Sequence, residues 1–179
     1  MMPDNSISNI YFIDSSSLVT IFRTTSNDLI DQIWEKLEEL FLNGRMFSHR
    51  FVYDEITTDS KRPDLLSKKI TPLQTYFKPV IFEQAQLVSD IVKRFPNLID
   101  PKNEKEQAAP WLIAAAVLEQ NQYSLFNPNK KVYVVSEESE SDPNGIPSVS
   151  KGLGLEHLNL SSLYQINNWS FEVKEPFNG

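Results

Sequence analysis

The sequence contains no cysteine, so it can form neither a disulfide framework nor a thiolate-ligated metal site. It also has no run of about 18 or more apolar residues, and we therefore expect no membrane-spanning helix. The first residues, Met1 to Ser6, lack the basic and apolar regions of a signal peptide. Together these absences predict a cytoplasmic protein that does not contact a membrane.

An excess of basic residues is missing as well. The chain has 17 Lys and Arg against 24 Asp and Glu, which gives a net charge of −7. This balance argues against a protein that coats nucleic acid electrostatically, but it leaves room for an enzyme with a small, locally basic substrate path. It also suits a site that gathers acids around a divalent cation. The only two histidines, His49 and His157, are isolated from each other and carry little weight as catalytic bases.

Length and hydropathy pattern predict one α/β domain, 1–179. A hydrophobic fraction of 40% is ordinary for a globular protein, and 179 residues are enough for a core. Apolar β-prone runs predict strands at 10–13, 45–48, 131–136 and 169–173. Stripes at helical spacing predict helices at 15–23, 27–43, 51–57, 63–76, 83–95, 110–120 and 160–166, with polar loops at 97–107 and 137–145. This alternation indicates a three-layer α/β/α sandwich around a mostly parallel sheet.

The first predicted strand ends at an acid. Residues 10–13 read Ile-Tyr-Phe-Ile, as in a strand buried on both faces, and Asp14 and three serines follow directly. In open α/β sheets, ligands bind outside the carboxyl ends of the strands. Asp14 is therefore a candidate ligand for a metal ion or a substrate. An N-cap of the following helix is an equally good explanation for an aspartate here.

Two further segments supply acids. Glu55 lies in the predicted helix 51–57, and Glu137 and Glu138 follow the buried strand at 131–136. If this strand and the first are parallel neighbours, the two glutamates lie at the same sheet edge as Asp14. Mg²⁺ and Mn²⁺ prefer hard oxygen ligands, so acids from distant segments are the pattern to seek. The alternatives are a solvated helical glutamate for Glu55 and an acidic surface loop for Glu137 and Glu138.

Position 109 lacks the side chain that its surroundings favour. Pro110 suits the first position of a helix, which would make Ala109 the N-cap. Alanine is a poorer N-cap than aspartate or serine by about 1 kcal/mol. The position therefore favours an oxygen-bearing side chain, and the sequence supplies a methyl group.

Taken in order, these segments resemble a PIN-like nuclease domain, and within that group the DUF4411 branch. The resemblance runs from Ile10 to about Leu163, and the order and spacing of its segments carry it. Those segments are Tyr11 to Leu18, Trp34 to Leu37 before Gly44 and Arg45, Val52 to Ile56, Ala108 to Ala114, Val134 to Glu138, and Ile146 to Val149 before Gly152 to Leu155.

The resemblance implies a Mg²⁺- or Mn²⁺-dependent ribonuclease, often the toxin half of a toxin–antitoxin pair. By position, Asp14 would be the first metal ligand, Glu55 the second acid and Glu138 the last acid. Supporting positions would be Ser16, the hydroxyl beside Asp14, then Ser136, which takes a threonine position of the family, and Glu137 between Ser136 and Glu138. Metal ions held by such acids would activate a water for attack on an RNA phosphodiester. RNA is the implied substrate and a protein antitoxin the implied partner; the oligomer is left open, with a homodimer as one option.

Two positions depart from the family pattern. The family has Asp-Pro where this chain has Ala109-Pro110, and it tends to have cysteine where Ser150 stands. The first departure removes an expected metal ligand, so we expect the nuclease to be impaired. Ala109 can be an engineered inactivation, a natural loss that leaves a binding or regulatory module, or a change compensated by Glu106. A phosphatase of the haloacid-dehalogenase type is disfavoured, because Ser16 stands where its second aspartate is required.

Overall fold

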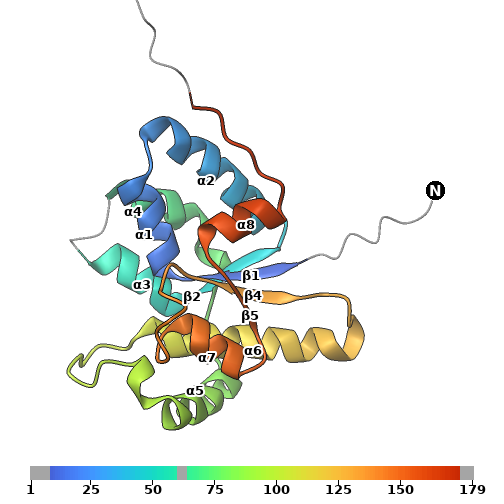
Figure 1. The fold of residues 1–179 in the computed structure, drawn as a ribbon. Helices are drawn as coiled ribbons and strands as arrows, with labels where there is room; N and C mark the ends of the chain where they lie inside the picture. The colour runs from blue at the N-terminus through green and yellow to red at the C-terminus, as the bar shows by residue number, and fades with distance from the viewer. Residues whose placement is uncertain (1–8, 60–63, 174–179) are drawn as a thin grey trace, which may run out of the picture.

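The computed structural model describes residues 9–59 and 64–173, which form a parallel five-stranded sheet between two layers of helices (Figure 1). The strand order is β3-β2-β1-β4-β5, and every neighbouring pair is parallel. This confirms the predicted three-layer α/β/α architecture. The strands are β1 (Ile10–Ile13), β2 (Met46–His49), β3 (Phe77–Lys78), β4 (Val132–Val135) and β5 (Glu156–Leu158).

Helices cover both faces of this sheet (Figure 1). One face carries α1 (Ser15–Thr24), α2 (Asn27–Leu42), α4 (Asp64–Ile70) and α8 (Leu160–Ile166). The other carries α5 (Phe82–Arg94), α6 (Ala108–Phe126) and α7 (Ile146–Gly152). Helix α3 (Arg50–Thr58) follows β2 directly and contacts α1, α4 and α6. Short 3₁₀ helices η1 (Thr71–Tyr76) and η2 (Pro96–Leu98) complete the described elements.

The central strands and α6 form the middle of the core. Residues of β1 and β4 are buried on both faces, as their uninterrupted apolar runs predict. The first half of α6 is buried as well, because it lies between the sheet and α5. This position explains why the sequence of α6 is apolar nearly all round rather than along one stripe.

Several predicted elements need correction. Strands β3 and β5 and helix α7 were missed, because two or three residues at a sheet edge and a seven-residue helix give too little periodicity to recognise. The predicted strand 169–173 is absent. These residues have no regular structure; Trp169 stacks on Tyr164, and Phe171 meets the Tyr164 ring edge to face. The predicted helix 63–76 divides into α4 and η1 near Pro72, which cannot donate an intrahelical hydrogen bond. Its first position, 63, lies outside the described residues.

The sheet has its topological switch point beside β1. The chain continues from β1 to β2 on one side, and β4 pairs with β1 on the other. The carboxyl ends of β1 and β4 therefore meet, and the Asp14 N–H donates to the Val135 carbonyl at 2.9 Å. Ligand sites of open α/β sheets lie at such a point. Within 9–59 and 64–173, no helix has the length and apolar character needed to cross a membrane.

Candidate functional site

Asp14 ends β1 and also caps α1. Its backbone is extended, and its Oδ2 accepts from the Ser16 N–H at 3.0 Å. The capping explanation is therefore confirmed. Asp14 is only 6% exposed, which holds the carboxylate at the carboxyl end of the sheet rather than in bulk water. A cap and a ligand role are compatible, because a carboxylate has two oxygens and several acceptor positions.

Glu55 is not the solvated helical glutamate that was considered above. It is partly buried on α3, and both of its carboxylate oxygens are bound. Oε2 accepts from the Ser15 hydroxyl at 2.9 Å, and Oε1 accepts from the Ala108 N–H at 3.2 Å. Glu55 therefore connects α3 to the starts of α1 and α6, and it faces the same end of the sheet as Asp14.

Glu138 lies in the loop after β4, and its side chain contacts the start of α7. Its Oε2 accepts from the Ile146 N–H at 2.6 Å. A Cβ built on Gly145 would come within 2.9 Å of this oxygen, so the absence of a side chain at 145 leaves room for the carboxylate. Burial raises the pKa of Glu138, and the charges of Asp14 and Asp142 raise it further, while the bond from Ile146 lowers it.

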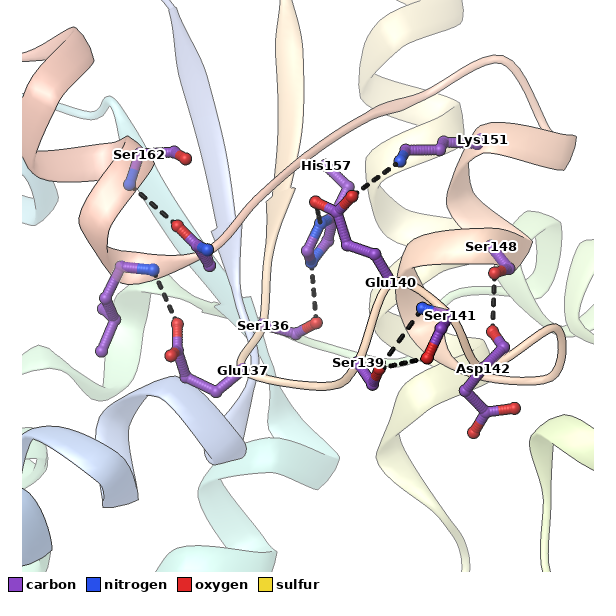
Figure 2. A network of polar contacts seen from close by, with 12 residues as sticks. Ser136, Glu137, Ser139, Glu140, Ser141, Asp142, Ser148, Lys151, His157 and Ser162 are labelled. Carbon is purple, nitrogen blue, oxygen red and sulfur yellow. Dashed lines mark hydrogen bonds and ion pairs between the residues drawn. The ribbon is translucent and has the colours of Figure 1, made fainter.

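The three predicted supporting residues tie the ends of β1 and β4 together. The Ser16 hydroxyl accepts from the Glu137 N–H at 3.1 Å. The Glu137 carboxylate in turn accepts from the Leu160 N–H at 2.6 Å, at the start of α8. Ser136 is fully buried, and its Oγ lies 2.9 Å from His157 Nε2 (Figure 2). The loop after β4 is therefore anchored at its first two residues.

Four helix N-termini meet the acids at this end of the sheet. The positive end of a helix dipole stabilises a nearby carboxylate, so these termini offset part of the repulsion among the acids. The pairs of acceptor and donor are Asp14 with Ser16 of α1, Glu55 with Ala108 of α6, Glu138 with Ile146 of α7, and Glu137 with Leu160 of α8.

The site does not fit a bound Mg²⁺ or Mn²⁺ as it stands. In the part of the chain that the structure describes, no group of three or more His, Cys, Asp or Glu side chains is placed to hold a metal ion. Asp14, Glu55 and Glu138 lie at one end of the sheet, and each accepts from a backbone N–H there, but they are not grouped closely enough to hold an ion. The position where a fourth acid is expected carries the methyl group of Ala109.

The N-cap assignment of Ala109 was wrong. Helix α6 begins at Ala108, its N-cap is Gln107, and Ala109 is the second helical residue. Pro110 is tolerated in the first turn of α6 because backbone N–H groups in the first turn have no intrahelical carbonyl to donate to, so the absence of an N–H loses no hydrogen bond. Ala109 is partly buried against the core. The Oε1 of Glu106, the residue considered as a replacement, accepts from Trp111 Nε1 at 2.5 Å.

The sequence prediction missed three residues of this region. Ser15 binds Glu55, although only Ser16 had been singled out from the three serines. Gly145 leaves space for Glu138, and His157 contacts Ser136. The run of hydroxyls after Asp14 was a usable signal for Ser15. Nothing in the sequence placed Gly145 or His157 near the acids, because those contacts depend on the return of the chain through α7 and β5.

The family comparison covers this whole region. A family model described as "Domain of unknown function (DUF4411)" matches residues 11–171, which is most of the chain. No curated protein matches the chain. The matched range includes every strand residue except Ile10 and every position of the candidate site, and its description assigns no activity.

Proposed function

We propose that this chain, which belongs to the DUF4411 family, has the scaffold of a PIN-type endoribonuclease that depends on Mg²⁺ or Mn²⁺. In this proposal Asp14, Glu55 and Glu138 are the acids that remain of the metal site. Ala109 replaces a further acidic ligand, and this chain is therefore impaired as an enzyme. The reaction is hydrolysis of RNA phosphodiester bonds.

One observation carries the proposal. Three acids from segments far apart in the sequence come to the carboxyl end of a parallel sheet at its switch point, where α/β folds bind ligands. Asp14 and Glu138 interact electrostatically although 124 residues separate them (138 − 14). Bringing like charges together costs free energy by repulsion, and a divalent cation bound between them would offset this cost.

The proposal includes partners and a location. A ribonuclease that acts as a toxin needs a protein antitoxin, and an acidic chain of net charge −7 that approaches RNA is suited to control by such a partner. The proposed compartment is the cytoplasm. A homodimer is an alternative to a monomer.

A second candidate function is a catalytically inactive binding or regulatory module on the same scaffold. The observation that favours it is the capping of helix N-termini by all three remaining acids, which gives each of them a structural role without a metal ion. The two functions differ in one measurable property, which is binding of Mn²⁺ when an acid is present at position 109.

The test is the substitution Ala109→Asp. We expect the substituted protein to cleave RNA in the presence of Mn²⁺ or Mg²⁺, and to stop when a chelator is added. The unsubstituted chain is expected to be about a hundredfold slower or inactive, a loss typical of removing one group that stabilises the transition state. Ala109→Asn is the matched control, because it has the shape of aspartate without the charge that binds a hard cation.

Three results would contradict parts of this proposal. If the Ala109→Asp protein cleaves no RNA with either metal, the nuclease assignment fails. If it also binds no Mn²⁺ in titration calorimetry, the binding module is the better assignment. If the unsubstituted chain cleaves RNA as fast as the Ala109→Asp protein, position 109 does not have the role given to it.

A further inference from the structure

One imidazole contacts both ends of the segment that carries Glu138. His157 belongs to β5, and its register partner on β4 is Val134. Its Nε2 lies 2.9 Å from Ser136 Oγ, and its Nδ1 lies 3.9 Å from Glu140 Oε1 (Figure 2). Ser136 precedes Glu138 by two residues, and Glu140 follows it by two. The histidine therefore brackets Glu138 from the neighbouring strand.

The two contacts differ in kind. Ser136 and His157 are both buried, so their hydrogen bond satisfies polar atoms that have no access to bulk water. The approach to Glu140 is not a hydrogen bond, since 3.9 Å is too long, and it becomes an ion pair only when His157 is protonated. Glu140 also lies 3.5 Å from the ammonium group of Lys151 on α7. The strand side of the loop is thus held by a hydrogen bond, and the far side by charges.

A Ser-His-Glu catalytic triad is not what this arrangement provides. Ser136 is 0% exposed, so its hydroxyl cannot meet a substrate from solution. His157 Nδ1 has no hydrogen-bond partner among the described residues, whereas a triad histidine is oriented by a hydrogen bond from this atom to the acid. Burial lowers the pKa of His157, with Lys151 in the same direction and Glu140 and Ser136 opposing, so the ring is neutral near pH 7.

The position of the Glu138 carboxylate depends on where this loop lies. Its Oε2 occupies a narrow place between the Ile146 N–H at 2.6 Å and the Cα of Gly145, where even a methyl group would be too close. A shift of the loop away from Ile146 would lengthen this bond, and a shift toward residue 145 would bring the carboxylate against the backbone of Gly145. Residues that hold the loop therefore set the position of the carboxylate.

We propose that His157 is a positioning residue for Glu138, acting through its hydrogen bond to Ser136, two residues before Glu138. The statement that this positions a metal ligand rests on the proposed function. The statement that His157 fixes the loop does not, and the two are tested separately.

The first test measures amide hydrogen exchange in His157→Phe, which keeps a buried ring of similar size without its nitrogens. The amides of Glu137 and Asp142 are hydrogen-bonded and report on the loop. We expect their exchange to accelerate about tenfold, while the Tyr11 amide inside the sheet changes only with global stability. His157→Gln, which can still bond to Ser136, is expected to recover most of the protection of Glu137.

Leu155→Ala is the matched control. Leu155 is buried immediately before β5, so its substitution destabilises the protein without removing a side-chain polar contact. If Leu155→Ala accelerates exchange at Glu137 and Asp142 as much as His157→Phe does at equal unfolding free energy, His157 has no specific role and the proposal is overturned. Equal exchange in His157→Phe and the parent chain overturns it as well.

The second test uses the Ala109→Asp background. We expect His157→Phe to raise the Mn²⁺ concentration needed for half-maximal cleavage about tenfold, because loss of a residue that orients a metal ligand weakens metal binding. The KM for RNA should not change. Leu155→Ala should leave this concentration unchanged. If Ala109→Asp is active and His157→Phe needs no more Mn²⁺, then His157 does not position Glu138 as a ligand. If Ala109→Asp is inactive, the proposed function fails, and the exchange measurement still decides the role of His157.

Discussion

Asp14, Glu55 and Glu138 each serve the fold while occupying positions that a metal site would use. Each gives one oxygen to a backbone N–H at the start of a helix. A carboxylate at a helix N-terminus is stabilised by the helix dipole, which is why these acids can lie near one another without a cation.

We expect ionisation of Glu138 to lower the free energy of unfolding. Burial and the charge of Asp14 raise its pKa, so the folded protein binds a proton at Glu138 more tightly than the unfolded chain does. The substitution Glu138→Gln mimics the protonated group and keeps an acceptor for the Ile146 N–H. At pH 7 we expect Glu138→Gln to unfold at the same or higher denaturant concentration than the parent. The advantage should shrink as pH falls through the folded-state pKa, because the parent then becomes neutral at this position too.

Denaturant unfolding monitored from pH 4 to pH 8 gives this comparison. A variant that is clearly less stable than the parent at pH 7 would show that the bond from Ile146 outweighs burial and repulsion. Glu140→Gln serves as the control, because it removes the same charge from the same loop without the bond to Ile146.

At the scale of elements, the helices at the site begin at the carboxyl end of the sheet. Some of them follow a strand directly, and others reach this end after a loop. Helix α1 begins one residue after Asp14, and α3 begins where β2 ends. Helix α6 has no side-chain cap of its own, since Gln107 makes no capping bond. The missing cap is supplied from α3 by Glu55, which makes the start of α6 depend on another element.

The substitution Glu55→Ala should destabilise the protein by about 1–2 kcal/mol. It removes an N-cap interaction at α6, typically about 1 kcal/mol, and leaves the Ser15 hydroxyl without this acceptor. Glu55→Gln is the matched control, because its amide oxygen can still accept from one of the two donors, and it should lose about half as much. Equilibrium unfolding in urea measures both differences. Equal stability of Glu55→Ala and the parent would show that Glu55 does not cap α6.

For the molecule as a whole, the switch point of the sheet decides where the site lies. Because β1, β2 and β4 are parallel, the segments that follow them lie at one end of the sheet, and the family match extends across all of these segments. Two buried histidines lie near this end: His49 caps α3 through Phe51 and contacts Gln84, and His157 contacts Ser136. Both are embedded in the structure rather than presented to solvent.

These histidines predict acid sensitivity of the fold. Burial lowers the pKa of His49, with Gln84 and Asp54 opposing, and it lowers the pKa of His157. An unfolded histidine has a pKa of about 6.5, so below this pH the unfolded chain takes up protons that the folded protein does not. The free energy of unfolding should therefore fall as pH decreases from about 6.5 toward the lowered folded-state values. Urea titrations at pH 7.5, 6.5 and 5.5 measure this slope.

His49→Gln and His157→Gln should each make that slope shallower, because each removes one group that is protonated only on unfolding. A single-site variant that keeps the slope of the parent would mean that its histidine titrates alike in the folded and unfolded states.

The sequence by itself determined the fold class, the two central strands, most of the helices and the segments that carry acids. It could do so because buried parallel strands and amphipathic helices leave strong patterns within a few consecutive residues. Only the tertiary structure decided the short edge strands β3 and β5, the true start of α6, and the partners of Glu55, Glu138 and His157. Those features depend on contacts between residues far apart in the chain, which no local pattern records.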